Sequence, residues 1–245
     1  MSDVKTLVIG IDAATWVQMR PLLDAGTLPH IQALMDAGTV GELRSTTPPM
    51  TPLAWTSMAT GVNPGKHGIY DFVSQDRTTY QISPNNLTRM PRPTIWDLFS
   101  THGRPIGVLN WPLCYPPAQV KPFFTSGIGS PSGGQVAYPP ELNARLKSLN
   151  YRIYTRLGPN NTAEDYFNDV KELTEIQANL LVELMKESDW ELLWAVFMGV
   201  DWVQHYHWEA EVDDQRVVEK MYCFNFLKNS VRPCRLFNSL LIRTG

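Results

Sequence analysis

The chain has 245 residues, of which 43% are hydrophobic, so it can bury a sizeable core and is not a disordered chain. Its 21 basic and 24 acidic residues give a formal net charge of −3, and without a long basic run this excludes general attraction to nucleic acid. There is no basic, long-apolar leader and no run of roughly 18 apolar residues, so we expect a cytoplasmic protein without a membrane partner. Three cysteines without C-x-x-C spacing predict ordinary thiols: Cys114, Cys223 and Cys234.

The N-terminal third predicts alternating strands and helices. Residues 5–11, "KTLVIGI", form a β-rich apolar run, and Asp12 follows at its carboxyl end. Helices are expected at about 16–25 and at 29–37, and "VGELRS" returns as a strand. This strand, helix, strand order favours a parallel sheet.

The later part of the chain repeats this pattern. Helical spacing covers 94–103 and 170–187, and apolar runs at 105–111 and 190–200 predict buried strands. The fold class we expect is therefore α/β, a mostly parallel sheet with helices on both faces. Between about 111 and 161, proline, glycine and serine are frequent, which predicts a loop-rich segment over the strand ends or a plain surface excursion.

We expect the chain to divide at residue 220, where the predicted α/β pattern ends. Residues 1–220 are expected to form one partial α/β domain, and 221–245 a divergent C-terminal tail. The tail is apolar enough for a helix as far as Val231, and Pro233 interrupts it.

The stretch "MTPLAWTSMATGVNPGKHG" raises a question about Thr51. Threonine is a good N-cap and proline is tolerated in the first helical turn, so Thr51-Pro52 predicts a helix start. Thr51 is then simply a cap, or it also lies where a helix N-terminus attracts phosphate oxygens. Nearby, His67 is interpreted as part of a loop and Lys66 as a solvated lysine.

A second candidate is "GVDWVQHYHW", which places Asp201 just after a strand and His205 four residues later. On a helix, these positions share a face, so a carboxylate and an imidazole can bind one ion such as zinc. Taken singly, Asp12 is more often a turn or cap residue, and Asp201 with His205 a surface acid beside a hydrogen-bonded histidine. In a parallel sheet, however, Asp12, Thr51 and Asp201 would meet at the carboxyl edge.

Three segments together resemble one family. "VIGIDAATW", "TPPMTPLAWTSMATGVNPGKHGIYDF" and "VDWVQHYHW" are similar to the type I phosphodiesterase / nucleotide pyrophosphatase branch of the alkaline phosphatase superfamily. The resemblance implies two divalent metal ions, zinc in this family: one bound by Asp12 and Thr51, the other by Asp201 and His205. It also implies that Thr51 is the nucleophile and forms a phospho-threonine intermediate.

The sequence departs from that family in two places. Ala54 stands where nucleotide pyrophosphatases often carry a phosphate-contacting asparagine, and neither a Ser-Asp-His-Gly segment nor the later zinc-binding histidine occurs. Each metal would then have two protein ligands, against the usual three in catalytic zinc sites. The chain is therefore expected to be C-terminally incomplete.

We expect a metal-dependent phosphoesterase that hydrolyses a phosphodiester or pyrophosphate bond of a small, nucleotide-like phosphate ester, incomplete in this chain. One alternative is a noncatalytic remnant with a metal- or phosphate-binding edge. Another is an enzyme similar to phosphoglycerate mutases, which share the fold. Sulfatases are disfavoured, because their Cys/Ser-x-Pro-x-Arg signature is missing.

Overall fold

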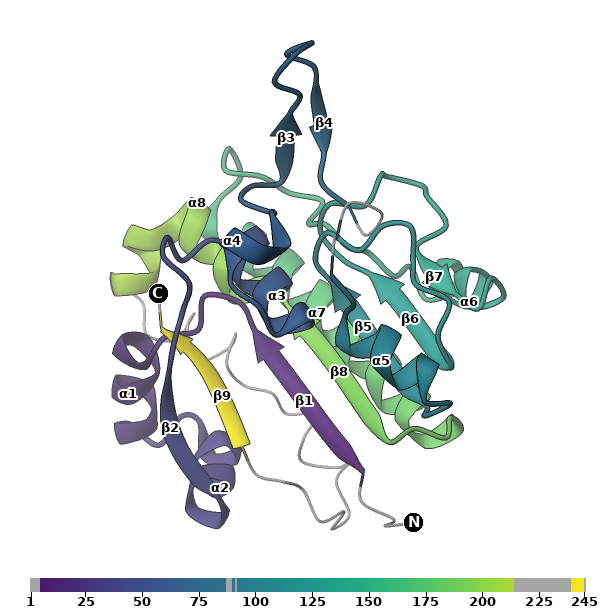
Figure 1. The fold of residues 1–245 in the computed structure, drawn as a ribbon. Helices are drawn as coiled ribbons and strands as arrows, with labels where there is room; N and C mark the ends of the chain where they lie inside the picture. Colours follow the sequence, from purple (N-terminus) through teal and green to yellow (C-terminus); the bar gives the residue numbers. More distant parts are fainter. Residues whose placement is uncertain (1–4, 87–89, 91, 214–238, 245) are drawn as a thin grey trace. The chain divides into compact units, whose positions relative to one another are not determined.

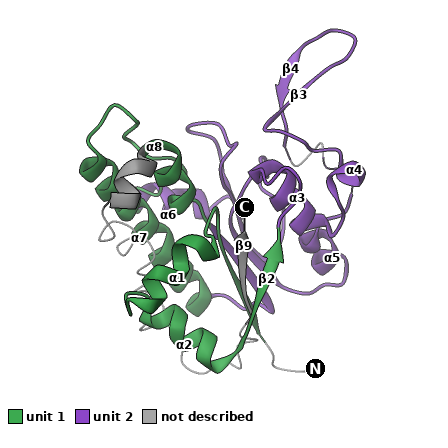
Figure 2. Cartoon of the chain, turned by 90° about the vertical axis from the view of Figure 1, so that its left-hand side faces the viewer, with its two compact units in different colours: residues 1–44, 149–187, 197–245 green, residues 45–148, 188–196 purple. Residues whose placement is uncertain are grey.

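The computed structural model describes residues 5–86, 90, 92–213 and 239–244. They fall into two compact units: unit 1 takes residues 1–44, 149–187 and 197–245, and unit 2 takes 45–148 and 188–196 (Figure 2). Cys223, Cys234 and the helix expected up to Val231 lie outside the described residues. Within the described part, no helix is both long and apolar enough to cross a bilayer.

The strands of the sheet in unit 2 run mostly parallel. They are β5 (Ile106–Trp111), β6 (Pro122–Ser126), β7 (Ala137–Tyr138) and β8 (Leu192–Phe197), the last up to residue 196. β5 pairs in parallel with β8 on one side and with β6 on the other, and β7 is antiparallel to β6. Every residue of β5 and β8 is buried. This explains why both strands are continuous apolar runs without alternation.

The helices of unit 2 have clear start and stop signals in the sequence. They are α3 (Thr51–Thr60), α4 (Pro64–His67), α5 (Ile95–Thr101) and α6 (Leu142–Ser148). Thr94 caps α5 through a capping box with Asp97, and Gly61 ends α3 with a left-handed φ of 67°. A hairpin of β3 (Val73–Gln75) and β4 (Ile82–Pro84) projects from the rest of unit 2 (Figure 1).

Unit 1 combines short strands with longer helices. Its strands are β1 (Thr6–Ile11), β2 (Thr39–Arg44) and β9 (Ser239–Thr244), and its helices are α1 (Trp16–Asp24), α2 (Pro29–Ala37), α7 (Ala163–Glu187) and α8 (Gly199–Asp213). β9 runs parallel to β2, with Thr39 opposite Ser239 (Figure 1). The tail therefore contributes a strand that sequence patterning did not predict.

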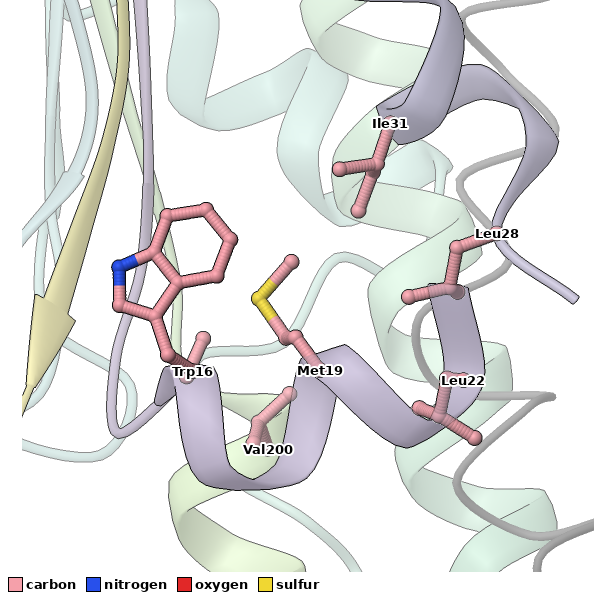
Figure 3. Close-up of a cluster of buried hydrophobic side chains, with 7 residues drawn as sticks. Trp16, Met19, Leu22, Leu28, Ile31 and Val200 are labelled. Atoms are coloured by element: carbon pink, nitrogen blue, oxygen red, sulfur yellow. The ribbon is translucent and has the colours of Figure 1, made fainter. Parts of the chain in front are cut away.

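One apolar cluster joins α1, α2 and the start of α8. Its buried members include Trp16, Met19, Leu22, Leu28, Ile31 and Val200 (Figure 3). Trp16 and Met19 lie three positions apart on α1 and face the same side, as the helical period requires. Because Val200 belongs to this cluster, the first turn of α8 is fixed relative to α1.

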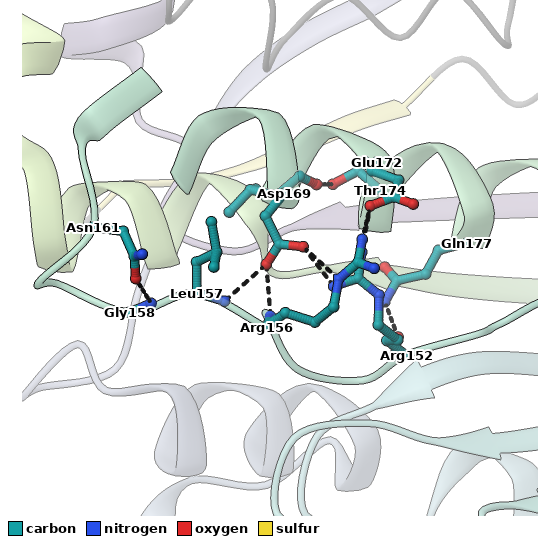
Figure 4. Close-up of polar contacts among 10 residues, drawn as sticks. Arg152, Arg156, Leu157, Gly158, Asn161, Asp169, Glu172, Thr174 and Gln177 are labelled. Carbon is teal, nitrogen blue, oxygen red and sulfur yellow. Dashed lines mark hydrogen bonds and ion pairs between the residues drawn. The ribbon is translucent and has the colours of Figure 1, made fainter. Parts of the chain in front are cut away.

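A second anchor in unit 1 is polar and holds the segment before α7. The Asp169 carboxylate accepts hydrogen bonds from Arg152 Nη1 at 2.6 Å and from the backbone N–H groups of Arg156 and Leu157 at 2.6 and 3.1 Å (Figure 4). Gln177 Nε2 donates to the carbonyl of Arg152 at 2.9 Å. These bonds tie an irregular segment to α7 at two positions, eight residues apart along the helix.

The α/β class with a mostly parallel sheet is confirmed. The expected strands and helices all form in the described part, although α7 begins at Ala163 rather than near residue 170. The segment 111–161 is mostly irregular, as expected, and it also contains β6, β7 and α6. The division at residue 220 stays a prediction.

Candidate active site

Asp12 lies where sequence patterning placed it, directly after β1. Its backbone N–H donates to the carbonyl of Phe197 at 2.9 Å, which joins the ends of β1 and β8 within unit 1. The side chain of Asp12 is almost fully enclosed, since the residue is 1% exposed. Ala13 then turns the chain with a left-handed φ of 58°. A buried carboxylate at a strand end is costly unless hydrogen bonds or a cation stabilise it.

Asp201 and His205 lie on consecutive turns of α8. Asp201 is in the first turn, where the helix dipole favours a negative charge. His205 Nε2 is 3.5 Å from Asp201 Oδ1, so the two donor groups face one another as the i, i+4 spacing predicts. The side chain of Asp201 is 18% exposed and that of His205 is 70% exposed. The Asp201 carboxylate and the His205 imidazole can therefore offer one oxygen and one nitrogen to the same ion at a position near solvent.

Gln204 connects this pair to the turn after Asp12. Its Nε2 donates to the carbonyl of Ala13 at 3.3 Å and to Gln18 Oε1 at 2.9 Å. Both bonds lie within unit 1 and fix the first turns of α8 beside the end of β1. Gln204 was not predicted from the sequence, because a glutamine between two candidate ligands carries no motif of its own. Its position three residues after Asp201, on the same helical face, was the available signal.

α7 packs against α8 through a pair of tyrosines. Tyr166 of α7 and Tyr206 of α8 meet edge to face, with ring centroids 5.3 Å apart. Burial, together with the neighbouring Tyr206, Asp169 and Asp201, raises the pKa of Tyr166 to about 12. Its phenol therefore stays neutral at physiological pH, next to the residue that follows His205.

Thr51 belongs to unit 2 and corrects one prediction. The N-cap of α3 is Met50, not Thr51, and no side chain caps this helix. Met50 has extended φ and ψ of −107° and 143°, and its carbonyl accepts the first helical bond from Ala54 N at 3.0 Å. Thr51 is the first helical residue and Pro52 the second. The Thr51 hydroxyl is therefore not the helix cap, but it lies at the positive end of the α3 dipole.

The first turns of α3 are anchored by aromatic packing within unit 2. Trp55, one turn after Thr51, meets Trp111 at the carboxyl end of β5 with centroids 5.4 Å apart. Trp111 also contacts Trp96 and Trp194 at 5.1 and 5.0 Å. These contacts place the start of α3 beside the carboxyl end of β5, which is the ligand-binding edge of open parallel sheets.

His67 is structural, but it is not a loop residue as expected. It ends the short helix α4, is completely buried, and its Nε2 lies 3.0 Å from Ser57 Oγ of α3. Ile69 N donates to Nδ1 at 3.1 Å, so the proton of a neutral ring is on Nε2. Burial lowers the pKa of His67, and a hydrogen bond with the backbone of Leu53 offsets this only in part. The ring joins α3 to α4.

The structure thus brings part of the predicted site together. Unit 1 joins the end of β1, which carries Asp12, to the α8 turns that carry Asp201 and His205, whereas Thr51 lies in unit 2. The meeting of all four side chains stays a prediction. Among the residues that the structure describes, no group of three or more His, Cys, Asp or Glu residues is arranged to hold a metal ion.

These elements define an α/β protein of the alkaline phosphatase-like fold. The chain belongs to the type I phosphodiesterase / nucleotide pyrophosphatase family, whose profile matches residues 6–222. No curated protein matches the chain at a significant level.

Two solved structures share this fold. The first is phosphonoacetate hydrolase from Sinorhizobium meliloti 1021 in complex with phosphonoacetate, with a TM-score of 0.59, 17% identity, and coverage of 91% of this chain and 52% of that one. The second is the inactive form of murine ectonucleotide pyrophosphatase / phosphodiesterase 5, in complex with AMP. Its TM-score is 0.52 and its identity 17%, and the match covers 98% of this chain and 56% of that one. The chain therefore spans about half the length of these two proteins.

Proposed function

We propose that this chain carries part of the site of a metal-dependent phosphoesterase that hydrolyses a phosphodiester or pyrophosphate bond through a phospho-Thr51 intermediate. The observation that carries the proposal is the placement of Asp201 and His205, whose donor atoms lie 3.5 Å apart on α8, beside the strand end that carries Asp12. Membership of the family supports the reaction class. We expect a small phosphate ester with a nucleotide-like leaving group as substrate.

The residues present fit a divalent cation. Carboxylate oxygen and imidazole nitrogen are ligands that zinc accepts, and Asp201 with His205 supplies one of each at a partly exposed position. Asp12 and Thr51 would hold a second ion. When bound, such ions stabilise negative charge on the attacking and leaving oxygens of a phosphoryl transfer.

The remaining roles belong to the chain itself. Thr51 Oγ would give up its proton and attack phosphorus, the P–O bond to the leaving group would break, and the leaving group would depart as an alcohol or phosphate. Water would then hydrolyse the phospho-Thr51 ester, which releases the phosphate product and restores the hydroxyl. The α3 helix would direct its N-terminal dipole at the phosphoryl oxygens, and Ala54, which is buried, offers no polar group to the phosphate at its own position. Neighbouring proteins support this substrate class, since one is bound to phosphonoacetate and the other, an inactive threonine-to-alanine variant, is bound to AMP.

The test compares Thr51→Ala with the parent chain, using a bis(nitrophenyl) phosphate and added Zn²⁺. We expect turnover to fall about 1000-fold or more, as for loss of other catalytic nucleophiles. Thr60→Ala is the matched control, because Thr60 ends the same helix and its hydroxyl donates to the carbonyl of Thr56. Equal turnover in Thr51→Ala and the parent would contradict the proposal.

A noncatalytic remnant is the second candidate. It is favoured by the absence, among the described residues, of a group of three or more His, Cys, Asp or Glu residues placed to hold a metal. A parent chain that binds Zn²⁺ through Asp201 and His205 but has no turnover would support this alternative over the enzyme.

A further inference from the structure

The β3–β4 hairpin has no partner for its exposed apolar side chains within the described structure. It projects from the rest of unit 2 (Figure 1), and no third strand joins it among the described residues. A two-stranded hairpin is marginally stable in water by itself. A covering surface would therefore stabilise it.

One face of the hairpin is largely apolar. The antiparallel register places Val73 opposite Pro84 and Gln75 opposite Ile82, and these four side chains share a face. Val73 is 45% exposed and Ile82 69% exposed. Tyr70 and Tyr80 are also exposed, so the hairpin region holds four of the ten large hydrophobic residues that are exposed in the described chain. Such clustering marks an interaction surface rather than scattered surface residues.

The charges of the hairpin argue against a membrane or a nucleic acid as the partner. Residues 70–84 contain two acids, Asp71 and Asp76, and one base, Arg77, which gives −1. Anionic lipid and phosphate backbones attract clusters of lysine and arginine, which this segment lacks.

We propose that the hairpin is a docking arm for a second copy of this chain, with the two apolar faces packed together and the arms antiparallel. Arg77 is exposed at the tip and Asp71 is exposed at the base. The other acid of the tip, Asp76, accepts hydrogen bonds from the backbone N–H groups of Thr78 and Thr79 within the turn. A two-fold axis that sets one tip against the other base would bring each Arg77 to the Asp71 of the second copy, so the charge pattern is self-complementary. The contact would involve one two-stranded hairpin from each copy, so we expect a weak dimer that dissociates at about 10–100 μM.

The first experiment measures sedimentation equilibrium of the full chain from about 1 to 300 μM. We expect a concentration-dependent dimer in the parent chain, weakened at least about 10-fold by Val73→Ser with Ile82→Ser. Val17→Ser in α1 is the control, because Val17 is 84% exposed but lies outside the hairpin, and it should leave the dimer unchanged. A monomer at every concentration, or a dimer indifferent to the double substitution, would overturn the proposal.

The second experiment tests the antiparallel arrangement by exchanging charges. Arg77→Asp should raise the dissociation constant of the dimer about 3- to 10-fold, because a symmetric dimer would lose two exposed Arg77–Asp71 pairs. Adding Asp71→Arg should restore the dimer. Because Asp71 Oδ1 also accepts a hydrogen bond from Phe72 N at 2.6 Å, circular dichroism and thermal unfolding must show that the double variant stays folded. A folded double variant that dimerises no better than Arg77→Asp alone would refute the antiparallel arrangement.

Discussion

At the scale of single residues, Asp169 shows how a buried carboxylate can be stabilised without a ligand. Burial alone raises the pKa of Asp169, but hydrogen bonds from Arg152 and from the backbone of Leu157 and Arg156 outweigh it, so the pKa lies below its ordinary value. The ionised form is therefore the one that favours folding. Its contribution is complete above the unfolded pKa of about 3.9 and is lost as the pH falls through the lower, folded pKa.

We therefore predict that Asp169→Asn lowers the free energy of unfolding by about 2 kcal/mol at pH 7, because two arginines lose their shared anion. The measurement is urea unfolding at pH 7 and at about pH 3, where the difference should shrink. Glu172→Gln is the control: Glu172 pairs with Arg152 at 3.1 Å, but its side chain is 52% exposed, so the cost should stay below about 1 kcal/mol. Equal costs for both variants would contradict this account.

Residue types and spacing predicted much of the candidate site. Asp12 after a strand and the Asp201–His205 pair on one helical face were both predicted, because strand ends and i, i+4 spacing follow from local periodicity. The N-cap of α3 was not, because Met50 adopts the cap conformation without a side-chain bond. Gln204 was missed because its partners, Ala13 and Gln18, are remote in sequence.

At the scale of elements, the carboxyl ends of β5 and β6 meet through an unusually close backbone approach. Gly127, directly after β6, donates its N–H to the carbonyl of Trp111 at 2.8 Å. A Cβ atom at this glycine would lie 2.2 Å from the carbonyl oxygen of Asn110. Only a residue without a side chain allows this contact.

We predict that Gly127→Ala destabilises the protein by about 3 kcal/mol or more, because the clash is with backbone and cannot be relieved by a rotamer change. Gly41→Ala in β2 is the matched control, since a Cβ there would meet no atom within 4 Å. Denaturant unfolding of both variants, followed by tryptophan fluorescence, measures the difference. A Gly127 variant as stable as the Gly41 variant would show that the β5–β6 contact is dispensable.

Long elements were predictable and short ones were not. The helix α7 and the strands β5 and β8 carry clear periodic or continuous apolar patterns. β6 was missed because Pro122 begins it and glycine and serine follow it, which together are typical of a loop. The three-residue strands β3 and β4 are too short to show alternation, and Tyr80 between them adopts a φ of 58° that no sequence rule assigns to tyrosine.

At the scale of the whole molecule, the ligand count decides how strongly metal should bind. With Asp201 and His205 on one ion and Asp12 and Thr51 on the other, each ion would have fewer than the three protein ligands usual in catalytic zinc sites. We predict that the chain retains fewer than two equivalents of Zn²⁺ after dialysis, as measured by elemental analysis. Asp201→Ala and His205→Ala should each reduce the retained zinc further.

Glu175→Ala is the control for that experiment. Glu175 is an exposed acid on α7 that pairs with Lys171, so its loss should leave zinc uptake unchanged. Two tightly held equivalents in the parent chain would mean that the chain has zinc ligands beyond the four predicted ones. If Asp201→Ala and His205→Ala both leave zinc uptake unchanged, Asp201 and His205 are not metal ligands.

The bond that joins Ala13, next to Asp12, to Gln204 of α8 has a consequence for biosynthesis. Gln204 reaches Ala13 across 191 residues of chain, so this junction cannot close until the ribosome has nearly finished the described sequence. Residues 45–148 of unit 2, in contrast, emerge as one continuous run and can begin to collapse much earlier. β1 is therefore synthesised long before this junction can form. Its unpaired backbone N–H and C=O groups make it a natural binding site for a chaperone.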